Sequence, residues 1–298
     1  MIDIAFLGTG AMMPTAQRWL SSALLRIDSQ LILLDCGEGT QIPWRSLGWG
    51  FKRLSLICFS HWHADHVAGL PGILHALAVA ERTEPLAIIG PKGTRDIVTS
   101  LRELAPVLPY DVVCADLANG QQWQQGNVRV DVCAGNHQVP VLVYRLSIAR
   151  RPAFQVDKAQ SGGVPREAWS RLADGVDVDG WKAEDYQGPP RRGLAVGFMT
   201  DTRPTQAALS LLQGVDLLIS EGTYGDDADE GNAIQNKHLT FREAATFASE
   251  AGVRRLVLTH FSPKMERPRD YLSNAQSAFA ATELADPGQV ITLNFPDQ

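Results

Sequence analysis

The sequence lacks the features that mark membrane, secreted and disordered proteins. Its longest strongly apolar runs, such as residues 31–34 and 215–219, are far shorter than the ~20 residues that a membrane helix needs. No basic region precedes an apolar stretch near residue 1, so a cytoplasmic location is the default expectation. With 45% hydrophobic and 20% charged residues, the 298-residue chain is also unlike collagen-like, disulfide-framework or disordered sequences.

Cysteine and positive charge are both scarce. The four cysteines form no CxxC pair, and three lie in apolar, strand-like runs, so we expect reduced core residues; they are Cys36, Cys58, Cys114 and Cys133. The net charge of -6 argues against a surface coated with positive charge for nonspecific nucleic-acid binding. A local exception spans residues 145–171, where six basic residues stand against two acidic ones.

What the sequence does contain is a long alternation of strand-like and helix-like segments. The short β-branched and apolar runs that predict strands are residues 2–7, 23–27, 31–35, 54–59, 86–90, 128–134, 141–148, 194–200, 215–220, 256–260 and 290–295. Helical periodicity covers residues 66–81, 94–105, 205–212 and 241–251. The last helix has a capping box at Thr240 and Glu243, and Gly252 is a plausible stop. We therefore expect an α/β protein, either one large domain or two fused halves.

Residues 150–190 differ in composition from the rest of the chain. Proline, glycine and charged residues dominate, and no sustained hydrophobic period runs through the middle of this segment. A connection of this length without regular structure is unusual inside a compact domain. We interpret it as an excursion from the core that serves a function.

The most informative segment is His61-Trp-His63-Ala-Asp65-His66. Residues i and i+2 do not share a helix face, so His61 and His63 point together only from extended or loop backbone. Three imidazoles and a carboxylate this close together suit a divalent cation, because both groups are ligands of first-row metals. Further candidate ligands follow other predicted strands: His137, Asp201 and His260. Together these residues are enough for two metal ions, an arrangement suited to phosphodiester hydrolysis.

A single histidine at the end of a strand is more often a polar residue at the sheet margin than a ligand. The HxHxDH pattern is different because it places several ligand types within six residues, and three further strand ends carry His or Asp. His75 lies inside the helical pattern and is interpreted as an ordinary residue on a helix face.

Other motifs accompany this segment along nearly the whole chain. They are residues 6–10 (FLGTG), 14–15 (PT) with Arg18, 35–41 (DCGEGTQ), 69–72 (GLPG), 90–93 (GPKG), 188–190 (GPP), 200–202 (TDT), 221–223 (EGT), 237–240 (KHLT) and 259–263 (THFSP). With HxHxDH, the chain resembles the metallo-β-lactamase superfamily and, more narrowly, the ribonuclease Z family of endonucleases that trim tRNA 3′ ends. That resemblance implies an αββα sandwich of two mixed β-sheets flanked by helices.

The resemblance also implies a set of residue roles. His61, His63 and His137 would hold one zinc ion, Asp65, His66 and His260 would hold the other, and Asp201 would bridge them. Asp65 would in addition be the general base, and His238, oriented by Glu221, would donate a proton to the leaving oxygen. Zinc is the expected metal, although manganese and iron also accept this ligand set.

The implied architecture is a single domain over residues 1–298, with residues 150–190 as an arm that binds pre-tRNA, in a homodimer that does not engage a membrane. The arm lacks the Gly-Pro tip that is usual in the family and has Val164-Pro165-Arg166 there. Two alternatives therefore stay open. One is a phosphodiesterase for small or cyclic substrates without tRNA activity, and the other is a silent regulator that binds metal or RNA without turnover.

Overall fold

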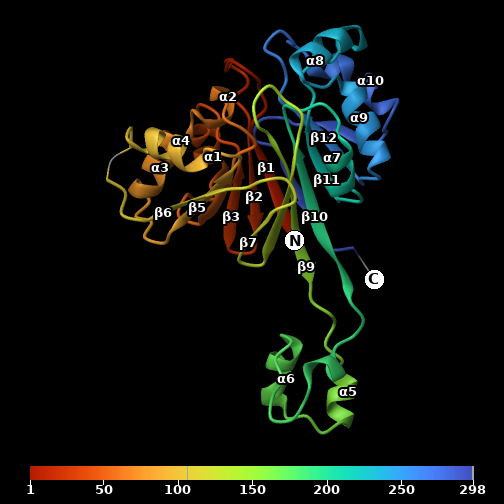
Figure 1. Ribbon diagram of the computed structural model, residues 1–298. Coiled ribbons are helices and arrows are strands. Elements are labelled where there is room, and N and C mark those ends of the chain that lie inside the picture. Colours follow the sequence, from red (N-terminus) through yellow and green to blue (C-terminus); the bar gives the residue numbers. More distant parts are fainter. Residues whose placement is uncertain (106, 297–298) are drawn as a thin grey trace.

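Two seven-stranded β-sheets pack face to face between layers of helices in the computed structural model, which describes residues 1–105 and 107–296 (Figure 1). In order across the first sheet, the strands are β14 (Val290–Leu293), β1 (Ile2–Gly8), β2 (Ser22–Ile27), β3 (Gln30–Leu34), β4 (Leu54–Cys58), β5 (Leu86–Gly90) and β6 (Val112–Asp116). The second sheet has the order β13 (Thr282–Leu284), β12 (Leu256–Thr259), β11 (Leu217–Glu221), β10 (Arg191–Met199), β9 (Leu142–Arg150), β8 (Val128–Ala134) and β7 (Gln122–Gln125). Both sheets mix parallel and antiparallel pairs, which confirms the predicted αββα class.

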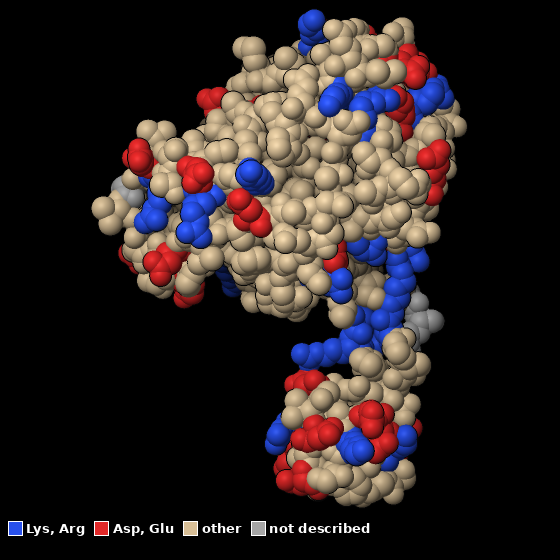
Figure 2. Space-filling model, in the orientation of Figure 1, with Lys and Arg blue, Asp and Glu red and all other residues tan. Residues whose placement is uncertain are grey.

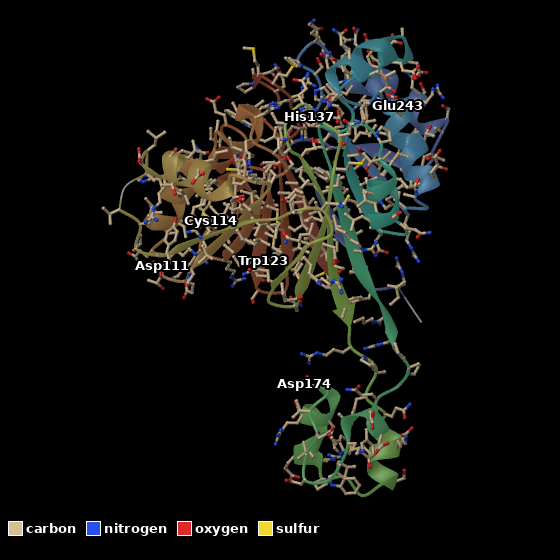
Figure 3. The ribbon with its side chains drawn as sticks, in the orientation of Figure 1. Asp111, Cys114, Trp123, His137, Asp174 and Glu243 are labelled. Carbon is tan, nitrogen blue, oxygen red and sulfur yellow. The ribbon has the colours of Figure 1, made fainter. Side chains whose placement is uncertain are left out.

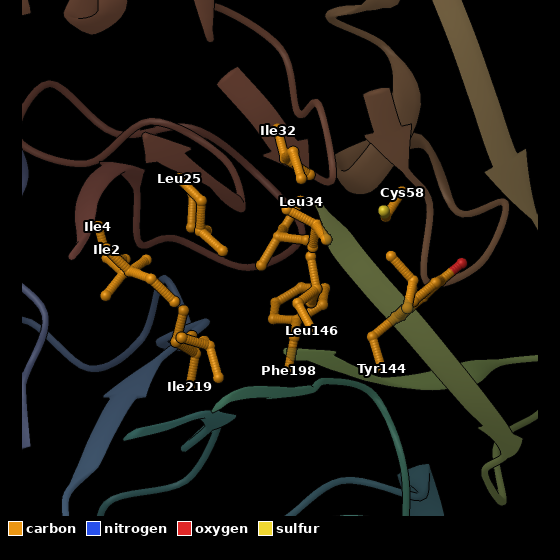
Figure 4. Packing of buried hydrophobic residues seen from close by; sticks show 14 of the residues in the cluster. Ile2, Ile4, Leu25, Ile32, Leu34, Cys58, Tyr144, Leu146, Phe198 and Ile219 are labelled. Carbon is orange, nitrogen blue, oxygen red and sulfur yellow. The ribbon is translucent and has the colours of Figure 1, made fainter. Parts of the chain in front are cut away.

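The main core lies between the two sheets. Alternate residues of each strand face inward, as the period of two in an extended backbone requires. Leu25 and Leu34 of the first sheet belong to the same buried cluster as Leu146, Phe198 and Ile219 of the second, and Figure 4 shows these side chains in the space between the sheets. The packing fixes the two sheets against each other, and with them the loops at their ends.

Helices cover the outer faces of both sheets. The first sheet is covered by α1 (Gln41–Leu47), α2 (Ala64–Val67), α3 (Leu70–Val79) and α4 (Thr94–Arg102). On the side of the second sheet lie α7 (Gln206–Leu211), α8 (Glu230–Asn236), α9 (Phe241–Glu250) and α10 (Leu272–Gln276), with 3₁₀ turns η2 (Asp227–Asp229) and η3 (Pro268–Tyr271) (Figure 1). Within the described residues, the structure contains no helix both long and apolar enough to cross a bilayer.

One predicted helix is broken in the structure. The segment expected over residues 66–81 forms α2 and α3, separated at Ala68 and Gly69. Gly69 donates its backbone N–H to the Cys36 carbonyl, and a Cβ at Gly69 would lie 2.1 Å from the Gly37 carbonyl oxygen. The close approach of these two backbones ends α2 after a single turn, which carries Asp65 and His66.

A long pair of strands carries a separate small unit away from the sandwich. Between β9 and β10 lie α5 (Val156–Ser161), α6 (Arg166–Ala173) and the 3₁₀ turn η1 (Ala183–Tyr186), which share a hydrophobic cluster of their own (Figure 1). The sequence pattern did not predict these elements, because segments this short have no room for a sustained hydrophobic period. We refer to residues 151–190 as the arm and to its attachment to β9 and β10 as the stalk.

The positive charge of this region lies at the stalk rather than on the arm. Residues 151–190 contain five Lys or Arg and seven Asp or Glu residues. Figure 2 shows the basic side chains gathered where the stalk leaves the sandwich, and both signs mixed on the arm. A cavity of 550 Å³ at this place is lined by Arg129, Arg145, Arg191 and Arg192. The excess predicted over residues 145–171 therefore does not extend over the arm as a whole.

Candidate metal centre

Seven predicted ligands meet at the end of the sandwich opposite the arm. His61 and His63 follow β4, His137 follows β8, Asp201 follows β10 and His260 follows β12. Asp65 and His66 come from the short α2. In Figure 3, His137 lies at one end of the sandwich, whereas Asp174 lies in the arm beyond the other end. The strand ends predicted from the sequence thus share one rim.

The first group of ligand atoms surrounds one carboxylate oxygen of Asp201. His61 Nε2 lies 3.0 Å from His63 Nδ1, which lies 3.4 Å from His137 Nε2. Asp201 Oδ2 is 3.6 Å from His61 Nε2 and 3.9 Å from His137 Nε2. One atom from each of these four residues is within 4.8 Å of all the others.

The second group faces the other oxygen of the same carboxylate. His66 Nε2 and His260 Nε2 are 3.1 Å apart, and Asp65 Oδ2 lies 3.7 Å from the former and 3.5 Å from the latter. Asp201 Oδ1 is 3.4 Å from His66 Nε2 and 3.2 Å from His260 Nε2. Asp201 is thereby placed between the two groups, with one oxygen toward each.

These separations fit ligands around metal ions. Bonds of about 2.0–2.1 Å to a tetrahedral zinc ion place neighbouring ligand atoms about 3.3 Å apart. Nitrogen atoms of two neutral imidazoles repel each other at such distances when both present lone pairs, and a cation between them removes the repulsion. The donor set therefore fits two divalent cations.

Hydrogen bonds behind the ligands fix the imidazole tautomers in the first sheet. The Ser60 hydroxyl donates to Asp35 Oδ2 at 2.7 Å, so it accepts from Nδ1–H of His61 at 3.0 Å. His66 Nδ1–H donates to the same Asp35 oxygen at 2.7 Å. In both histidines the proton is held on Nδ1, and Nε2 presents its lone pair to the centre.

Hydrogen bonds also fix the tautomers of the two histidines that follow strands of the second sheet. The Thr223 hydroxyl donates to Glu221 Oε2 at 2.7 Å and therefore accepts from His260 Nδ1–H at 3.0 Å. His137 Nδ1–H points to the Lys237 carbonyl oxygen at 3.3 Å. Nε2 of His260 and of His137 is thus left free to act as a metal ligand.

The electrostatics of the pocket keep Asp201 charged and two of the imidazoles neutral, whereas the pKa of His66, which burial alone would lower, is raised by the charges of Asp201 and Asp35. Burial would raise the pKa of Asp201, but the surrounding histidines, His260 first, outweigh it and hold the pKa well below its usual value. Burial is also the main cause that lowers the pKa of His61 and of His137. Neutral imidazole and ionised carboxylate are the forms that bind metal.

His238 and Glu221 form a separate pair at the edge of the centre. His238 Nδ1 lies 3.0 Å from Glu221 Oε2, and Glu221 is fully buried. Burial alone would lower the pKa of His238, but the charge of Glu221 and its hydrogen bond raise that pKa to about 9. Glu221 also accepts bonds from Thr202 N at 2.8 Å and from Leu239 N at 3.1 Å, so its carboxylate cannot rotate away.

Several contributing residues were not predicted as site residues. Asp35 and Thr223 lie in the motifs at residues 35–41 and 221–223, and Ser60 directly precedes His61, yet nothing local indicates that they hold histidines in place. Met12 donates its backbone N–H to Asp65 Oδ2 at 2.7 Å. The signal for Met12 is its left-handed backbone, with φ of 61°, which only the three-dimensional structure reveals.

The residues set aside in the sequence lie outside this centre. His75 is exposed on α3. All four cysteines are free, and Cys36, Cys58 and Cys133 are buried, where burial raises the pKa of each thiol. Three cysteines are therefore core residues, as expected, whereas Cys114 is only partly buried, on the edge strand β6.

Two family models match separate parts of the chain. The model described as Anti-Pycsar protein Apyc1 matches residues 2–104, and the β-lactamase superfamily domain matches residues 166–261. Ribonuclease Z from Lachnospira eligens is 40% identical over 303 residues, with 100% of both chains covered. Ribonuclease Z from Lachnoclostridium phytofermentans is 39% identical, with 99% of both chains covered.

Solved structures share the same architecture. The short form of human tRNase Z superimposes with a TM-score of 0.70 at 25% identity, covering 99% of this chain and 100% of that chain. The metallo-β-lactamase fold protein YhfI from Bacillus subtilis also gives a TM-score of 0.70, at 20% identity, covering 97% of this chain and 98% of that chain. The arrangement of the two sheets and their flanking helices is therefore a known fold.

Proposed function

The chain belongs to the ribonuclease Z family and is a metal-dependent endonuclease of tRNA 3′ processing, and we propose that the seven converging His and Asp residues are its catalytic metal centre. The observation that carries this proposal is the position of Asp201, one oxygen of which faces each of two ligand groups.

In this proposal, His61, His63 and His137 hold one divalent cation, Asp65, His66 and His260 hold the other, and Asp201 bridges them. Zinc is the proposed metal because imidazole and carboxylate at these spacings suit its coordination, and two such cations would lower the pKa of a water molecule toward ~7. Manganese and iron remain compatible with the same ligands.

The roles of the surrounding side chains follow from their chemistry. Asp65, held by the backbone N–H of Met12, accepts the proton of the attacking water. The bond that breaks joins phosphorus to a 3′ oxygen, which must leave as an alcohol. His238, whose Nδ1 is bound to Glu221, has Nε2 available to donate that proton.

The position of the arm supports a homodimer within this proposal. We treat residues 1–298 as one domain with residues 150–190 as its protruding arm. Strand β9 runs from the metal end of the sandwich to the stalk, a distance of roughly 30 Å for nine residues. The arm thus points away from the centre of its own chain (Figure 1). In a homodimer, the arm of one copy would lie near the metal centre of the other copy. The stalk arginines of the first copy would then contact phosphates of the RNA bound at that centre. The proposed setting is the cytoplasm.

The experiment that tests the function is cleavage of a 3′-extended pre-tRNA by the zinc-loaded protein. We expect one cut, which leaves a 3′ hydroxyl on the tRNA, and loss of turnover in Asp65→Ala. Replacing residues 151–190 by a short Gly-Ser linker should abolish pre-tRNA cleavage while preserving hydrolysis of bis(p-nitrophenyl) phosphate, because the linker leaves the centre intact.

Intact RNA after incubation with fully metal-loaded protein would contradict the proposal. Hydrolysis of the small diester without pre-tRNA cleavage, unaffected by the arm deletion, would select the small-molecule phosphodiesterase instead. No turnover of either substrate would select the silent regulator.

A further inference from the structure

A second cavity adjoins the metal centre. The cavity that contains the ligands has a volume of 370 Å³, and a neighbouring one has 270 Å³. They share part of their walls, formed by Thr223, Tyr224, Asn236, Ser262 and Lys264. The smaller cavity, which we call the side cavity, is enclosed by the loop after β11, by α8 and by the loop after β12. Among the described residues, the lining of the side cavity includes none of the proposed metal ligands and neither His238 nor Glu221.

The lining of the side cavity combines aromatic faces with hydrogen-bonding groups. Tyr224 and Tyr271 are both half-buried in its wall. Asn236 Nδ2 donates to the Tyr224 hydroxyl at 2.9 Å, and Asn232 Nδ2 donates to Asp229 Oδ1 at 2.8 Å. A flat ring with donors and acceptors on its edge, such as a nucleobase, matches these groups, because aromatic side chains stack on bases and amides bind base edges.

Charge decides which part of a nucleotide enters. Among the described residues that line the side cavity, Lys264 is the only cationic side chain, and it lies in the wall shared with the metal cavity. Asp226 and Asp229 add two carboxylates. Carboxylates repel a phosphodiester but accept hydrogen bonds from base N–H groups. The phosphate is therefore expected at the metal side of Lys264, and the base beyond it.

The direction of the strand follows from the proton donor. His238 protonates the 3′ oxygen that leaves, so the nucleotide on the 5′ side of the cut lies next to His238. The next aromatic ring on that side is Tyr224, whose centroid is 6.4 Å from that of His238. Resting on the function proposed above, we propose that the side cavity binds the base of the nucleotide 5′ to the cut. The first trailer nucleotide then lies toward Gln138 in the wall of the metal cavity.

The test compares three pre-tRNAs: one intact, one abasic at the nucleotide 5′ to the cut, and one abasic at the first trailer nucleotide. With the wild-type protein, removing the 5′ base should lower kcat/KM roughly tenfold or more, as expected for a stacked base. Tyr224→Leu should lower kcat/KM for the intact RNA by a similar factor and show little further loss on the 5′-abasic RNA. Hydrolysis of bis(p-nitrophenyl) phosphate should change little, because that substrate has no base.

Asn232→Ala and Gln138→Ala are the matched variants. Asn232 is exposed and lines only the side cavity, so its loss should reduce the penalty for removing the 5′ base without affecting folding. Gln138 lines the metal cavity and not the side cavity, so Gln138→Ala should leave that penalty unchanged. Two results would overturn this inference and leave the proposed function intact. In one, the wild type cleaves the 5′-abasic RNA as fast as the intact RNA. In the other, both Tyr224→Leu and Asn232→Ala lose as much kcat/KM as the wild type when the 5′ base is removed. Failure of the wild type to cleave intact pre-tRNA would overturn the proposed function as well.

Discussion

At the scale of single residues, the metal centre is built from side chains on unusual backbone. Asp201 and His260 have φ of 47° and 58°, and Asp35, which accepts the Nδ1–H of His66, has φ of 54°. Residues other than glycine rarely adopt this left-handed conformation, and they do so mainly where the surrounding structure compensates for the strain. Here the chain must turn sharply within one or two residues of a strand end to bring a ligand over the rim. In these three residues, the strained backbone therefore coincides with the proposed centre and the group that holds His66.

His238 provides a sharp test of the residue roles. His238→Ala should lower the pre-tRNA cleavage rate by about 100-fold or more, because the leaving 3′ oxygen then departs without a proton donor. The rate with bis(p-nitrophenyl) phosphate should fall much less, since p-nitrophenolate is stable without a proton. The measurement is the ratio of the two rates in the variant and in the wild type.

Metal content is the control for this variant. His238 Nδ1 lies 3.9 Å from Asp201 Oδ2, and His238 belongs to a further possible ligand group with Asp201 and His260. A variant that retains two equivalents of metal supports a proton donor. A variant that loses metal would show that His238 is a ligand.

At the scale of elements, the sequence patterns located the inner strands and missed outer ones. The three strands absent from the prediction, β6, β7 and β13, all lie at sheet edges. An edge strand has only one neighbour and is partly exposed, so its residues need not be uniformly apolar; β7, for example, reads QWQQ. The predicted helix over residues 241–251, in contrast, matches α9, and its capping box is present. A local sequence pattern therefore predicts a helix well when residues of that helix, such as its capping box, set where it begins.

The capping box also predicts a pH-dependent contribution to stability. Glu243 accepts the backbone N–H of Thr240 at 2.9 Å and pairs with Arg203, whose guanidinium also donates to the His238 carbonyl oxygen at 2.6 Å. Burial would raise the pKa of Glu243, but the bonds from Arg203 and Thr240 lower it below its ordinary value of 4.5. Because the native pKa is depressed, the stabilisation is present above pH 4.5 and disappears as the pH falls through the native pKa.

Glu243→Gln should therefore be about 1 kcal/mol less stable than the wild type at neutral pH. The difference should shrink as the pH falls below 4.5, because the wild-type carboxylate becomes protonated. Urea unfolding of both proteins over this range measures the difference. Glu250→Gln, an exposed change at the other end of α9, is the matched control. A difference between Glu243→Gln and the wild type that stays constant down to pH 3 would contradict the interpretation.

At the scale of the whole molecule, the centre joins the two sheets. Four of the proposed ligands come after a strand of the first sheet, and three come after strands of the second. The first four are His61, His63, Asp65 and His66, and the other three are His137, Asp201 and His260. Cations bound between them would cross-link the sandwich at one rim. Ligands that bind only the native state stabilise it by mass action, by about 2.7 kcal/mol at a concentration 100 times Kd.

Metal removal should consequently destabilise the entire fold. Chelation is expected to lower Tm by about 5 °C or more, and added Zn²⁺ should restore it. Asp201→Asn should show a much smaller response, because the group that faces both ligand sets has lost its charge. Thermal unfolding with parallel metal analysis is the measurement. An unchanged Tm after complete loss of metal would show that the centre does not connect the sheets.

The sequence by itself determined the α/β class, the inner strands and the candidate ligands, because short apolar runs, the HxHxDH spacing and polar residues after strands are local patterns, whereas the αββα sandwich was implied by the resemblance to a known family. Only the tertiary structure decided how Asp35, Ser60 and Thr223 orient the imidazoles, since Asp35 and Thr223 are far along the chain from the histidines they hold, and Ser60 is itself held by the distant Asp35. It also decided that the arm lies at the opposite end from the centre, and that α8, too short for a clear period, walls the side cavity. Properties that depend on which strand ends meet cannot be read from any one segment.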